Sequence, residues 1–380
     1  MAGSPPEGAF NHMIPVSEPL LDERACAYVQ EAVSTGWVSS DGRFIPEFER
    51  RWAEYCGVEH GVAVCNGTVA LQVAMEALRL EPGSEVILPS LTIISCVLAV
   101  IEAGCVPVLV DCEPDTWCMD MAQVAARITP RTRAIMPVHM YGHPVDMAPL
   151  LELAERHDLA VVEDAAEAHG AEYRGRRAGG MGTLGCFSFY ANKIITTGEG
   201  GMVVTADAAL AERMRSLRNL CFRRDRRFLH TELGHNYRMT NVQAAIGVSQ
   251  VERIEDHLAR KRRMAALYAE RLGDLSGLAL PVERPDVRNV YWMYGVVLDD
   301  NVPFDAVEFA RRLRDRGVDT RPFFLGMHEQ PVFHDRGLFV DEHYPQTERL
   351  ARRGLYLPSG LPLTEAQINT VCTAVREVIA

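Results

Sequence analysis

The sequence predicts an α/β protein with a mostly parallel central sheet, and three observations support this prediction. Seven short apolar runs of strand length follow one another between about residues 60 and 205, and most are rich in valine and isoleucine. Helical patterns separate these runs, which is typical of βαβ units. Hydrophobic residues make up 48% and charged residues 24% of the 380 residues, the balance of a globular protein with enough chain for a large core.

The expected strands and helices can be placed in chain order. The seven expected strands are 61–65, 85–89, 106–111, 133–140, 159–164, 184–190 and 201–205. The clearest helical patterns between them are 69–80 and 146–157. In sheets of this kind, ligands lie beyond the carboxyl ends of the strands. The residues directly after each apolar run are therefore the first candidates for a functional site.

The pattern changes beyond the last of these strands. A long helical stretch covers 241–272, a strand-like run covers 291–299, and an apolar helical pattern ends the chain. We therefore expect a large α/β domain over 14–250. A linking helix and a smaller C-terminal α+β domain would occupy 251–380.

Charge and cysteine usage exclude several classes of protein. The net charge is −12, whereas a nucleic-acid binder is normally basic, so we expect no nucleic-acid partner. The first dozen residues lack the apolar segment of a secretory signal, and no run has the roughly 18 apolar residues of a membrane span. None of the ten cysteines forms a CxxC pair, so we expect no zinc site and reduced thiols in a cytoplasmic protein.

Lysine is rare in this chain, which has only Lys193 and Lys261. Arginine does not deprotonate in proteins and so cannot form a covalent bond with an aldehyde. Lys193 lies between two strand-like runs, within the glycine- and hydroxyl-containing stretch 187–205. Partial desolvation there would lower its pKa and free the amine. Lys261 falls in the charged run 259–264, for which we predict a solvated helix face.

Two further groups follow expected strands. Asp164 closes the run 159–164 and would point into the ligand crevice, or alternatively cap a helix over the following small residues. The segment Cys65–Thr68 lies between a strand and a helix, where glycine allows a close approach and the helix N-terminus favours an anion. Taken alone, this segment is equally compatible with a simple capped turn.

Together these groups match one cofactor, pyridoxal phosphate. It needs a lysine for its aldehyde, a carboxylate for its ring nitrogen and an anion cradle for its phosphate. Lys193, Asp164 and Cys65–Thr68 supply one of each, all at strand ends of one predicted sheet.

At these residues the chain resembles the DegT/DnrJ/EryC1/StrS group of pyridoxal-phosphate sugar aminotransferases. The resemblance covers nearly the whole chain and is greatest to the perosamine-forming branch. The segments that carry it are 37–49, 163–175, 192–202 and 235–247. It implies the aspartate aminotransferase (type I) fold and pyridoxal phosphate as cofactor.

The resemblance also implies roles for individual residues. Lys193 would hold the cofactor covalently and move a proton, and Asp164 would pair with the ring nitrogen. Glu167 stands near the ring hydroxyl, where most of the group has glutamine. The phosphate ligands would be Gly67, Thr68 and Ser188, with Asn236 reaching the phosphate of the neighbouring subunit, so that a homodimer shares its active sites. The nucleotide-sugar site would be lined by Ser39, Phe323, Phe324 and His328.

Two positions depart from the pattern of the group. Ile93 replaces an aromatic residue that usually stacks on the cofactor ring, so the stacking contribution of about 0.5–1.5 kcal/mol would be smaller. Gly326 replaces a proline, which would loosen a loop expected to touch the substrate.

The resemblance implies amino transfer from L-glutamate to the 4-keto group of a nucleotide-linked 6-deoxyhexose, with GDP-4-keto-6-deoxymannose as the expected substrate. Three alternatives stay open. The first is another ketone within the same group, such as a dTDP- or UDP-linked ketohexose or a ketocyclitol. The second is a sugar dehydratase, although such relatives replace the lysine with histidine and this chain has Lys193. The third is a non-catalytic regulator that binds the cofactor.

Overall fold

The computed structural model describes residues 13–223 and 225–379. Its larger sheet has seven strands, in the order β1-β9-β8-β5-β4-β2-β3. In that order the strands span His60–Val64, Gly201–Thr205, Leu184–Ser188, Ala160–Asp164, Thr132–Ile135, Glu85–Pro89 and Val106–Val110. Neighbouring strands from β8 to β3 run parallel, and β9 is antiparallel to both of its neighbours. All seven expected strands therefore form, and the prediction of a mostly parallel sheet is confirmed.

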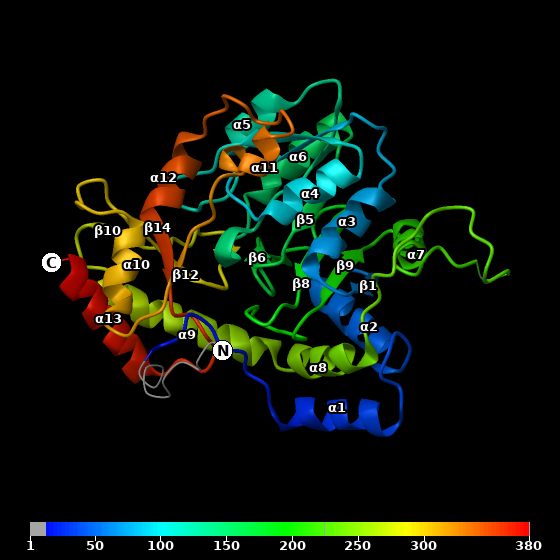
Figure 1. The fold of residues 1–380 in the computed structure, drawn as a ribbon, viewed down its shortest axis with the longest axis horizontal. Coiled ribbons are helices and arrows are strands. Elements are labelled where there is room, and N and C mark those ends of the chain that lie inside the picture. Colours follow the sequence, from blue (N-terminus) through cyan, green and yellow to red (C-terminus); the bar gives the residue numbers. More distant parts are fainter. Residues whose placement is uncertain (1–12, 224, 380) are drawn as a thin grey trace, which may run out of the picture.

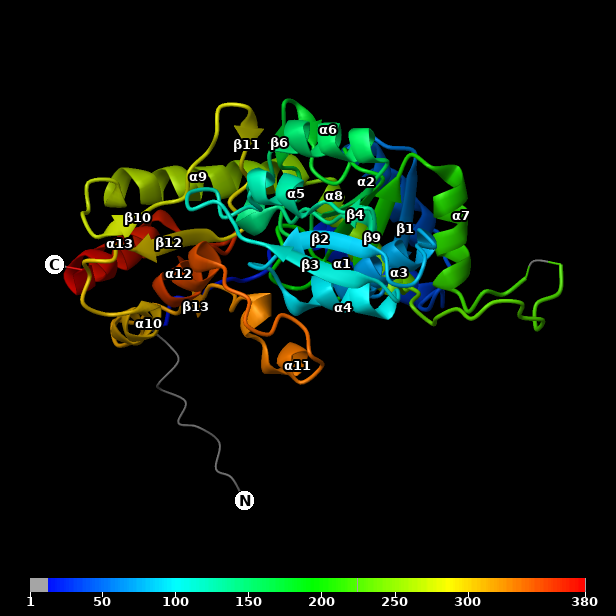
Figure 2. The same ribbon diagram turned by 90° about the horizontal axis from the view of Figure 1, so that it is seen from above.

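Helices cover both faces of this sheet, as βαβ connections require. The connecting helices are α3 (Gly67–Ala77), α4 (Ile94–Glu102), α5 (Met121–Arg127) and α6 (Met147–His157). Figure 2 shows α3 and α4 on one side of the sheet and α5 and α6 on the other. One layer of helices on each side of the sheet therefore buries both faces of its strands.

The predicted long helix over 241–272 is interrupted. It forms two helices, α8 (Asn241–Val251) and α9 (Ile254–Leu272), because the backbone at Arg253 leaves the helical region with φ −119° and ψ 10°. The two residues at the break are held by ion pairs to α1 (Glu23–Ser34) and the residue before it: Glu252 to Arg24, and Arg253 to Asp22. Local periodicity cannot register such tertiary contacts.

A second, antiparallel sheet of four strands follows in the order β10-β12-β14-β13. These strands span Leu278–Ala279, Tyr294–Leu298, Gly354–Leu357 and Arg321–Pro322, and helices α10 (Ala306–Arg314), α12 (Pro345–Arg353) and α13 (Glu365–Ile379) accompany them. A small third sheet joins β11 (Val287–Arg288), β6 (Glu172–Tyr173) and β7 (Arg176–Arg177). In Figure 1, α9 runs from beneath the large sheet toward the four-stranded one.

The buried hydrophobic residues form two clusters, one around each of the two larger sheets. The clusters do not divide cleanly by sequence position. Phe323 and Phe333 belong to the cluster of the seven-stranded sheet, whereas Ile14 belongs to that of the four-stranded sheet. The domain division at residue 250 stays a prediction.

The prediction for Lys261 is wrong. Its side chain lies on the face of α9 that is covered by the rest of the chain, and the residue is only 2% exposed. Its ammonium donates hydrogen bonds to the carbonyl oxygens of Trp292, at 2.8 Å, and Ser359. Burial lowers the pKa of Lys261 to about 7. The surrounding run is charged, but α9 turns this one position inward.

The ten cysteines are all free, and eight of them are buried. This arrangement agrees with the expectation of core thiols. Within the described ranges, no helix combines the length and apolar character that a membrane crossing requires.

Candidate active site

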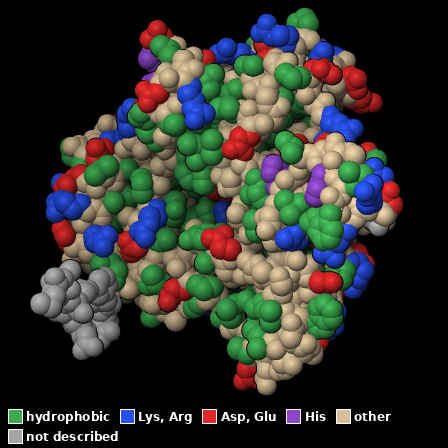
Figure 3. All heavy atoms as spheres, turned by 45° about the vertical axis from the view of Figure 1, so that its right-hand side comes forward, with side chains coloured by type: hydrophobic (Ala, Val, Ile, Leu, Met, Phe, Trp, Pro, Cys, Tyr) green, Lys and Arg blue, Asp and Glu red, His purple; other side chains and the backbone are tan. Residues whose placement is uncertain are grey.

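A cavity of about 630 Å³ opens where the carboxyl ends of the parallel strands meet residues from the C-terminal third of the chain. Seven of the predicted site residues lie on its wall: Gly67, Thr68, Asp164, Glu167, Ser188, Lys193 and Phe324. Six of them come from the first turn of α3, the ends of β5 and β8 and the loops that follow these strands, and Phe324 comes from the segment after β13. Figure 3 shows that the face it presents is hollowed near its centre, with hydrophobic side chains along the hollow.

Asp164 ends β5 with its side chain buried at the cavity. Its Oδ1 accepts a hydrogen bond from the backbone N–H of Ala166 at 3.0 Å, and its Oδ2 accepts one from the thiol of Cys96, also at 3.0 Å. The alternative of a helix cap does not hold, because residues 165–171 form turns and no helix. The carboxylate is therefore held by two neutral donors at the wall of the cavity.

Lys193 lies in the loop between β8 and β9, and its backbone N–H donates to the carbonyl of Tyr190 at 2.9 Å. Its Nζ lies 4.0 Å from Oε1 of Glu167 and 3.7 Å from the centre of the Trp292 ring. Burial lowers the pKa of Lys193, while the negative charges of Glu167 and Asp164 oppose that effect. The geometry thus combines a buried amine with two nearby carboxyl groups.

Glu167 carries the second carboxyl group of this pair. Burial raises the pKa of Glu167 to about 7, and the neighbouring ammonium of Lys193 and the N–H of Tyr141 limit the rise. That N–H donates to Oε2 of Glu167 at 2.8 Å. Near neutral pH, Glu167 can therefore accept or release a proton close to Lys193.

The first turn of α3 forms the anion-binding end of the cavity. Asn66 caps the helix, since its Oδ1 accepts the N–H of Val69 at 3.0 Å. A Cβ on Gly67 would lie 2.6 Å from the Cβ of Ser188, so only glycine fits at this point. The hydroxyls of Thr68 and Ser95 lie 2.8 Å apart on the same wall. Exposed N–H groups, the helix dipole and hydroxyls together suit a phosphate.

Pyridoxal phosphate fits the groups that this cavity presents. The buried amine of Lys193 suits an aldehyde, and the buried carboxylate of Asp164 suits a ring nitrogen. The close approach of Gly67 and Ser188 leaves a side-chain-free cradle at the helix N-terminus. These observations come from burial and contact, and they agree with the prediction made from residue types.

Several wall residues were not anticipated from the sequence. Trp292 and Tyr356 come from the C-terminal third of the chain, and Thr92 and Ser95 come from the loop and helix start after β2. The position of Thr92 and Ser95 after an apolar run was the signal that could have found them. Nothing local marks Trp292 or Tyr356, which reach the cavity only through tertiary packing. Ile93, the residue in place of an aromatic, lines the cavity and is 45% exposed.

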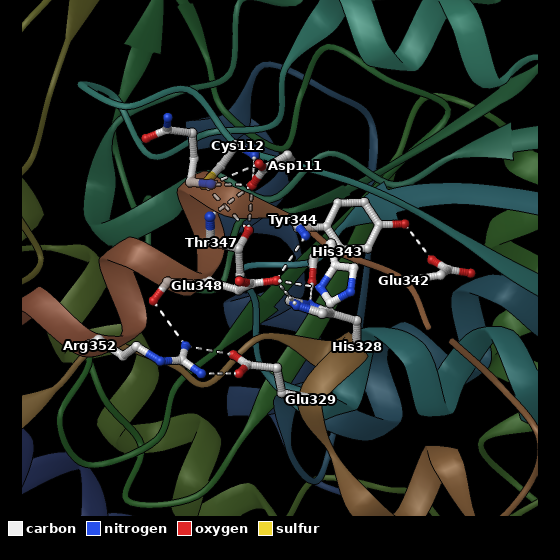
Figure 4. Close-up of polar contacts among 12 residues, drawn as sticks. Asp111, Cys112, His328, Glu329, Glu342, His343, Tyr344, Thr347, Glu348 and Arg352 are labelled. Atoms are coloured by element: carbon white, nitrogen blue, oxygen red, sulfur yellow. Dashed lines mark hydrogen bonds and ion pairs between the residues drawn. The ribbon is translucent and has the colours of Figure 1, made fainter. Parts of the chain in front are cut away.

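Three of the four predicted substrate residues are not on the cavity wall, and two of these, Phe323 and His328, are buried elsewhere. Phe323 is buried among aromatic rings, with ring centres 5.0 Å from Trp117 and 4.7 Å from Tyr141. His328 is buried in a polar network, where its Nδ1 lies 2.7 Å from Oγ of Ser90 and its Nε2 lies 3.1 Å from Oε1 of Glu348. Figure 4 shows His328 beside Glu348 of α12, within a cluster of hydrogen-bonded side chains. The Phe323 ring is thus engaged in core packing and the His328 imidazole in internal hydrogen bonds, although both were expected to bind substrate.

The same network explains Gly326. A Cβ at this position would lie 2.6 Å from Cε1 of His328, so the imidazole occupies the space that a side chain would need. The backbone φ of −54° is one that any residue adopts. The expectation of a loosened loop is therefore wrong, because this glycine is required by close packing.

The remaining two predicted residues, Ser39 and Asn236, are exposed and lie away from this cavity. The carbonyl of Ser39 accepts the N–H of Asn241 at 2.6 Å, at the start of α8. Asn236 pairs with Asn219 at the base of a segment, described over 222–223 and 225–233, that projects from the body of the molecule in Figure 1. Within one chain, neither residue meets the other predicted ligands.

Comparison with known proteins identifies relatives over almost the whole chain. Residues 19–376 match the DegT/DnrJ/EryC1/StrS aminotransferase family. The GDP-perosamine synthase of Caulobacter vibrioides is 45% identical, over 96% of this chain and 98% of the relative. The GDP-perosamine synthase of Escherichia coli O157:H7 is 39% identical, with the same shares. The crystal structure of the aminotransferase TlmJ from Streptoalloteichus hindustanus superposes with a TM-score of 0.90 at 34% identity, over 96% of this chain and 98% of that one.

Proposed function

The chain belongs to the DegT/DnrJ/EryC1/StrS aminotransferase family, and from this premise we propose that it converts GDP-4-keto-6-deoxymannose to GDP-perosamine with L-glutamate as amino donor. It is a pyridoxal-phosphate-dependent transaminase with the fold of the sugar aminotransferases. The 45% and 39% identity to two GDP-perosamine synthases supports the choice of substrate. The observation that carries the proposal is the buried amine of Lys193, which faces Asp164 and Glu167 in one cavity.

Different residues of the cavity would attach the cofactor, protonate its ring nitrogen and bind its phosphate. Bound pyridoxal phosphate supplies a carrier for the amino group and a sink for electrons. Lys193 would attach it through its amine and, when free, move a proton at the reacting carbon. Asp164 would keep the ring nitrogen protonated, since a buried carboxylate stabilises a neighbouring positive charge. Gly67, Thr68 and Ser188 would hold the phosphate.

Glu167 and the hydrophobic wall would control protons and water. With its pKa near 7, Glu167 can hold a proton beside the ring hydroxyl or pass it to a neighbour. Trp292, Phe324 and Tyr356 line the cavity, and their aromatic side chains would limit the access of water. Phe324 is the predicted substrate residue that lies on this wall.

The proposal includes a homodimer with shared sites. Asn236 lies at the base of a projecting segment whose side chains Phe228 and Leu233 are 83% and 89% exposed. Such exposed apolar side chains are typical of an interaction surface. If this segment packed against a second copy of the chain, Asn236 of the first copy would lie near the phosphate end of the second copy's cavity. We also place the enzyme in the cytoplasm, where its ten free cysteines would stay reduced.

Absorbance spectroscopy tests the proposed reaction in two steps. The visible band of the protein loaded with pyridoxal phosphate should bleach on addition of L-glutamate. It should return on addition of GDP-4-keto-6-deoxymannose, and more slowly with dTDP- or UDP-linked keto sugars. Lys193→Ala should show no visible band. A protein that ignores glutamate would contradict the donor, and a faster return with a dTDP- or UDP-linked sugar would contradict the substrate.

A further inference from the structure

Trp292 touches the lysine segment at two points. Its indole Nε1–H donates to the backbone carbonyl of Asn192 at 2.7 Å, directly before Lys193. The face of its ring lies 3.7 Å from Nζ of Lys193. One contact therefore holds the backbone that carries the lysine, and the other faces the end of its side chain. The ring is 3% exposed and forms part of the cavity wall.

The backbone of Trp292 is itself anchored by the other lysine of the chain. Nζ of Lys261 donates to the carbonyl of Trp292 at 2.8 Å and to the carbonyl of Ser359. Ser359 in turn accepts the N–H of Tyr294 on its Oγ at 2.9 Å, at the start of β12. Lys261 thus joins three separate parts of the chain: α9, the segment before β12 and the segment after β14.

A long lysine side chain needs such support for accurate placement of its amine. Four rotatable bonds separate the backbone of Lys193 from Nζ, and many rotamers are open to it in a wide cavity. An ammonium over an indole face is attracted by the electron density of the ring, and Trp gives the strongest contact of this kind. The hydrogen bond to Asn192 removes a second source of freedom, the movement of the loop.

We propose that Trp292 is a positioning residue for the amine of Lys193, and that Lys261 is the buried cation that keeps Trp292 in place. The inference rests on the assignment of Lys193 to the cofactor in the proposed function. It gives a function to Lys261, which was predicted to lie on a solvated helix face, and to Trp292, which no local sequence signal marks. Both act on the site through Lys193.

The rarity of lysine makes this inference directly measurable. Full-length protein labelled with ¹³C-lysine and freed of cofactor should give only two ε-CH₂ signals by NMR. In Lys193→Met one of these signals is lost, which assigns it to Lys193 and the other signal to Lys261. In the wild type, the ε protons of Lys193 should lie upfield of free lysine because they lie over the indole ring. In Trp292→Leu the signal should move to the position of free lysine.

The second readout is the capture of pyridoxal phosphate, in which an amine condenses with the aldehyde and water leaves. Stopped-flow absorbance should show this step slowed by roughly tenfold to a hundredfold in Trp292→Leu, the cost of a displaced reacting group. Phe324→Leu is the matched control, since it removes an aromatic side chain from the same wall and should leave the Lys193 signal in place. An equal loss of the upfield shift in both variants, or in neither, would overturn the proposal.

Two further variants keep the test decisive if Trp292→Leu does not fold. Trp292→Phe keeps a ring but loses the indole N–H, so the upfield shift should persist while capture slows. Lys261→Met should move the Lys193 signal in the same direction as Trp292→Leu, by a smaller amount. Wild-type capture rates in both variants would overturn the proposal. If Lys193→Met still captured the cofactor at the wild-type rate, the proposed function would be contradicted, because Lys193 would not bind the cofactor. The positioning of Lys193 by Trp292 is tested separately, since the chemical shift of Lys193 is measured without cofactor.

Discussion

At the scale of single residues, the site depends on two carboxyl groups and one amine that lie in the same cavity, where burial shifts the pKa values of Glu167 and Lys193. Asp164 is held by a thiol and a backbone N–H, both neutral donors, so its negative charge stays available to the cavity. Lys193 and Glu167 face each other across 4.0 Å, and burial shifts the pKa of each toward neutrality. Two titrating groups of this kind at one point are typical of a centre for proton transfer.

Loss of the Asp164 charge should impair turnover far more than cofactor binding. In Asp164→Asn, we expect kcat to fall by roughly a hundredfold or more, since a preorganised charge that stabilises the reacting system is removed. Steady-state kinetics with a saturating keto sugar measures this effect. Cys96→Ser is the control, because a hydroxyl retains a donor to Asp164 and should leave kcat within severalfold of the wild type. Wild-type turnover in Asp164→Asn would contradict its role at the ring nitrogen.

Glu167 should give the cofactor-free protein a distinctive pH dependence. Its pKa is raised from 4.5 to about 7 on folding, so between these values the folded state binds more protons than the unfolded state. The stabilisation is complete below pH 4.5 and is lost as the pH rises through 7, at up to about 1.4 kcal/mol per pH unit.

Urea denaturation between pH 4.5 and 8 tests this sign. Glu167→Gln should flatten the decline in the free energy of unfolding over that range, because glutamine does not titrate. Glu155→Gln, at an exposed position of α6, is the matched control and should leave the slope unchanged. A slope in Glu167→Gln equal to that of the wild type would contradict the raised pKa.

At the scale of elements, helix starts and strand ends do most of the positioning. The strand β1 and the helix α3 meet at Asn66 and Gly67, where a cap and a missing side chain leave the helix N-terminus free for an anion. Beyond the break between α8 and α9, α9 places Lys261 within hydrogen-bond distance of the Trp292 carbonyl. Small local irregularities in these elements therefore decide where the chemistry lies.

Gly67→Ala should damage the anion end of the cavity. The new Cβ would lie 2.6 Å from the Cβ of Ser188, so the protein should lose about 1–3 kcal/mol of stability and bind pyridoxal phosphate more weakly. Denaturation and cofactor titration measure the two effects. Asn66→Ala removes the helix cap at a cost of about 1 kcal/mol without adding an atom at the cradle. If both variants lost cofactor affinity equally, close packing at Gly67 would not be the cause.

At the scale of the whole molecule, the cavity forms where the seven-stranded sheet meets residues from the C-terminal third of the chain. The parallel sheet supplies the lysine, the carboxylates and the phosphate end, and the C-terminal third supplies Trp292, Phe324 and Tyr356. Asn236 alone among the proposed cofactor ligands lies outside this arrangement, at an exposed position at the base of the projecting segment. The proposed dimer accounts for that exception.

Subunit mixing tests whether active sites are shared. Lys193→Ala and Asn236→Asp should each be nearly inactive alone, the second because a negative charge would face the phosphate. After unfolding and refolding together in equal amounts, we expect about a quarter of wild-type activity, since half of the dimers would be hybrids with one intact site each. The same proteins refolded separately and then mixed are the control. No recovery in the co-refolded sample would contradict sharing through Asn236.

The sequence by itself determined the seven strands of the larger sheet, several of the helices and the chemical groups of the site. Apolar runs, helix caps and strand-end residues depend on local spacing, which the chain carries in its order of residues. A parallel sheet brings strand ends to one edge, so the sequence alone predicts that Asp164, Lys193 and Gly67 lie together. Only the tertiary structure decided what distant side chains do. Lys261 is buried, His328 and Phe323 turn into the core and Trp292 reaches Lys193, because contacts between residues far apart in sequence leave no local periodic signal.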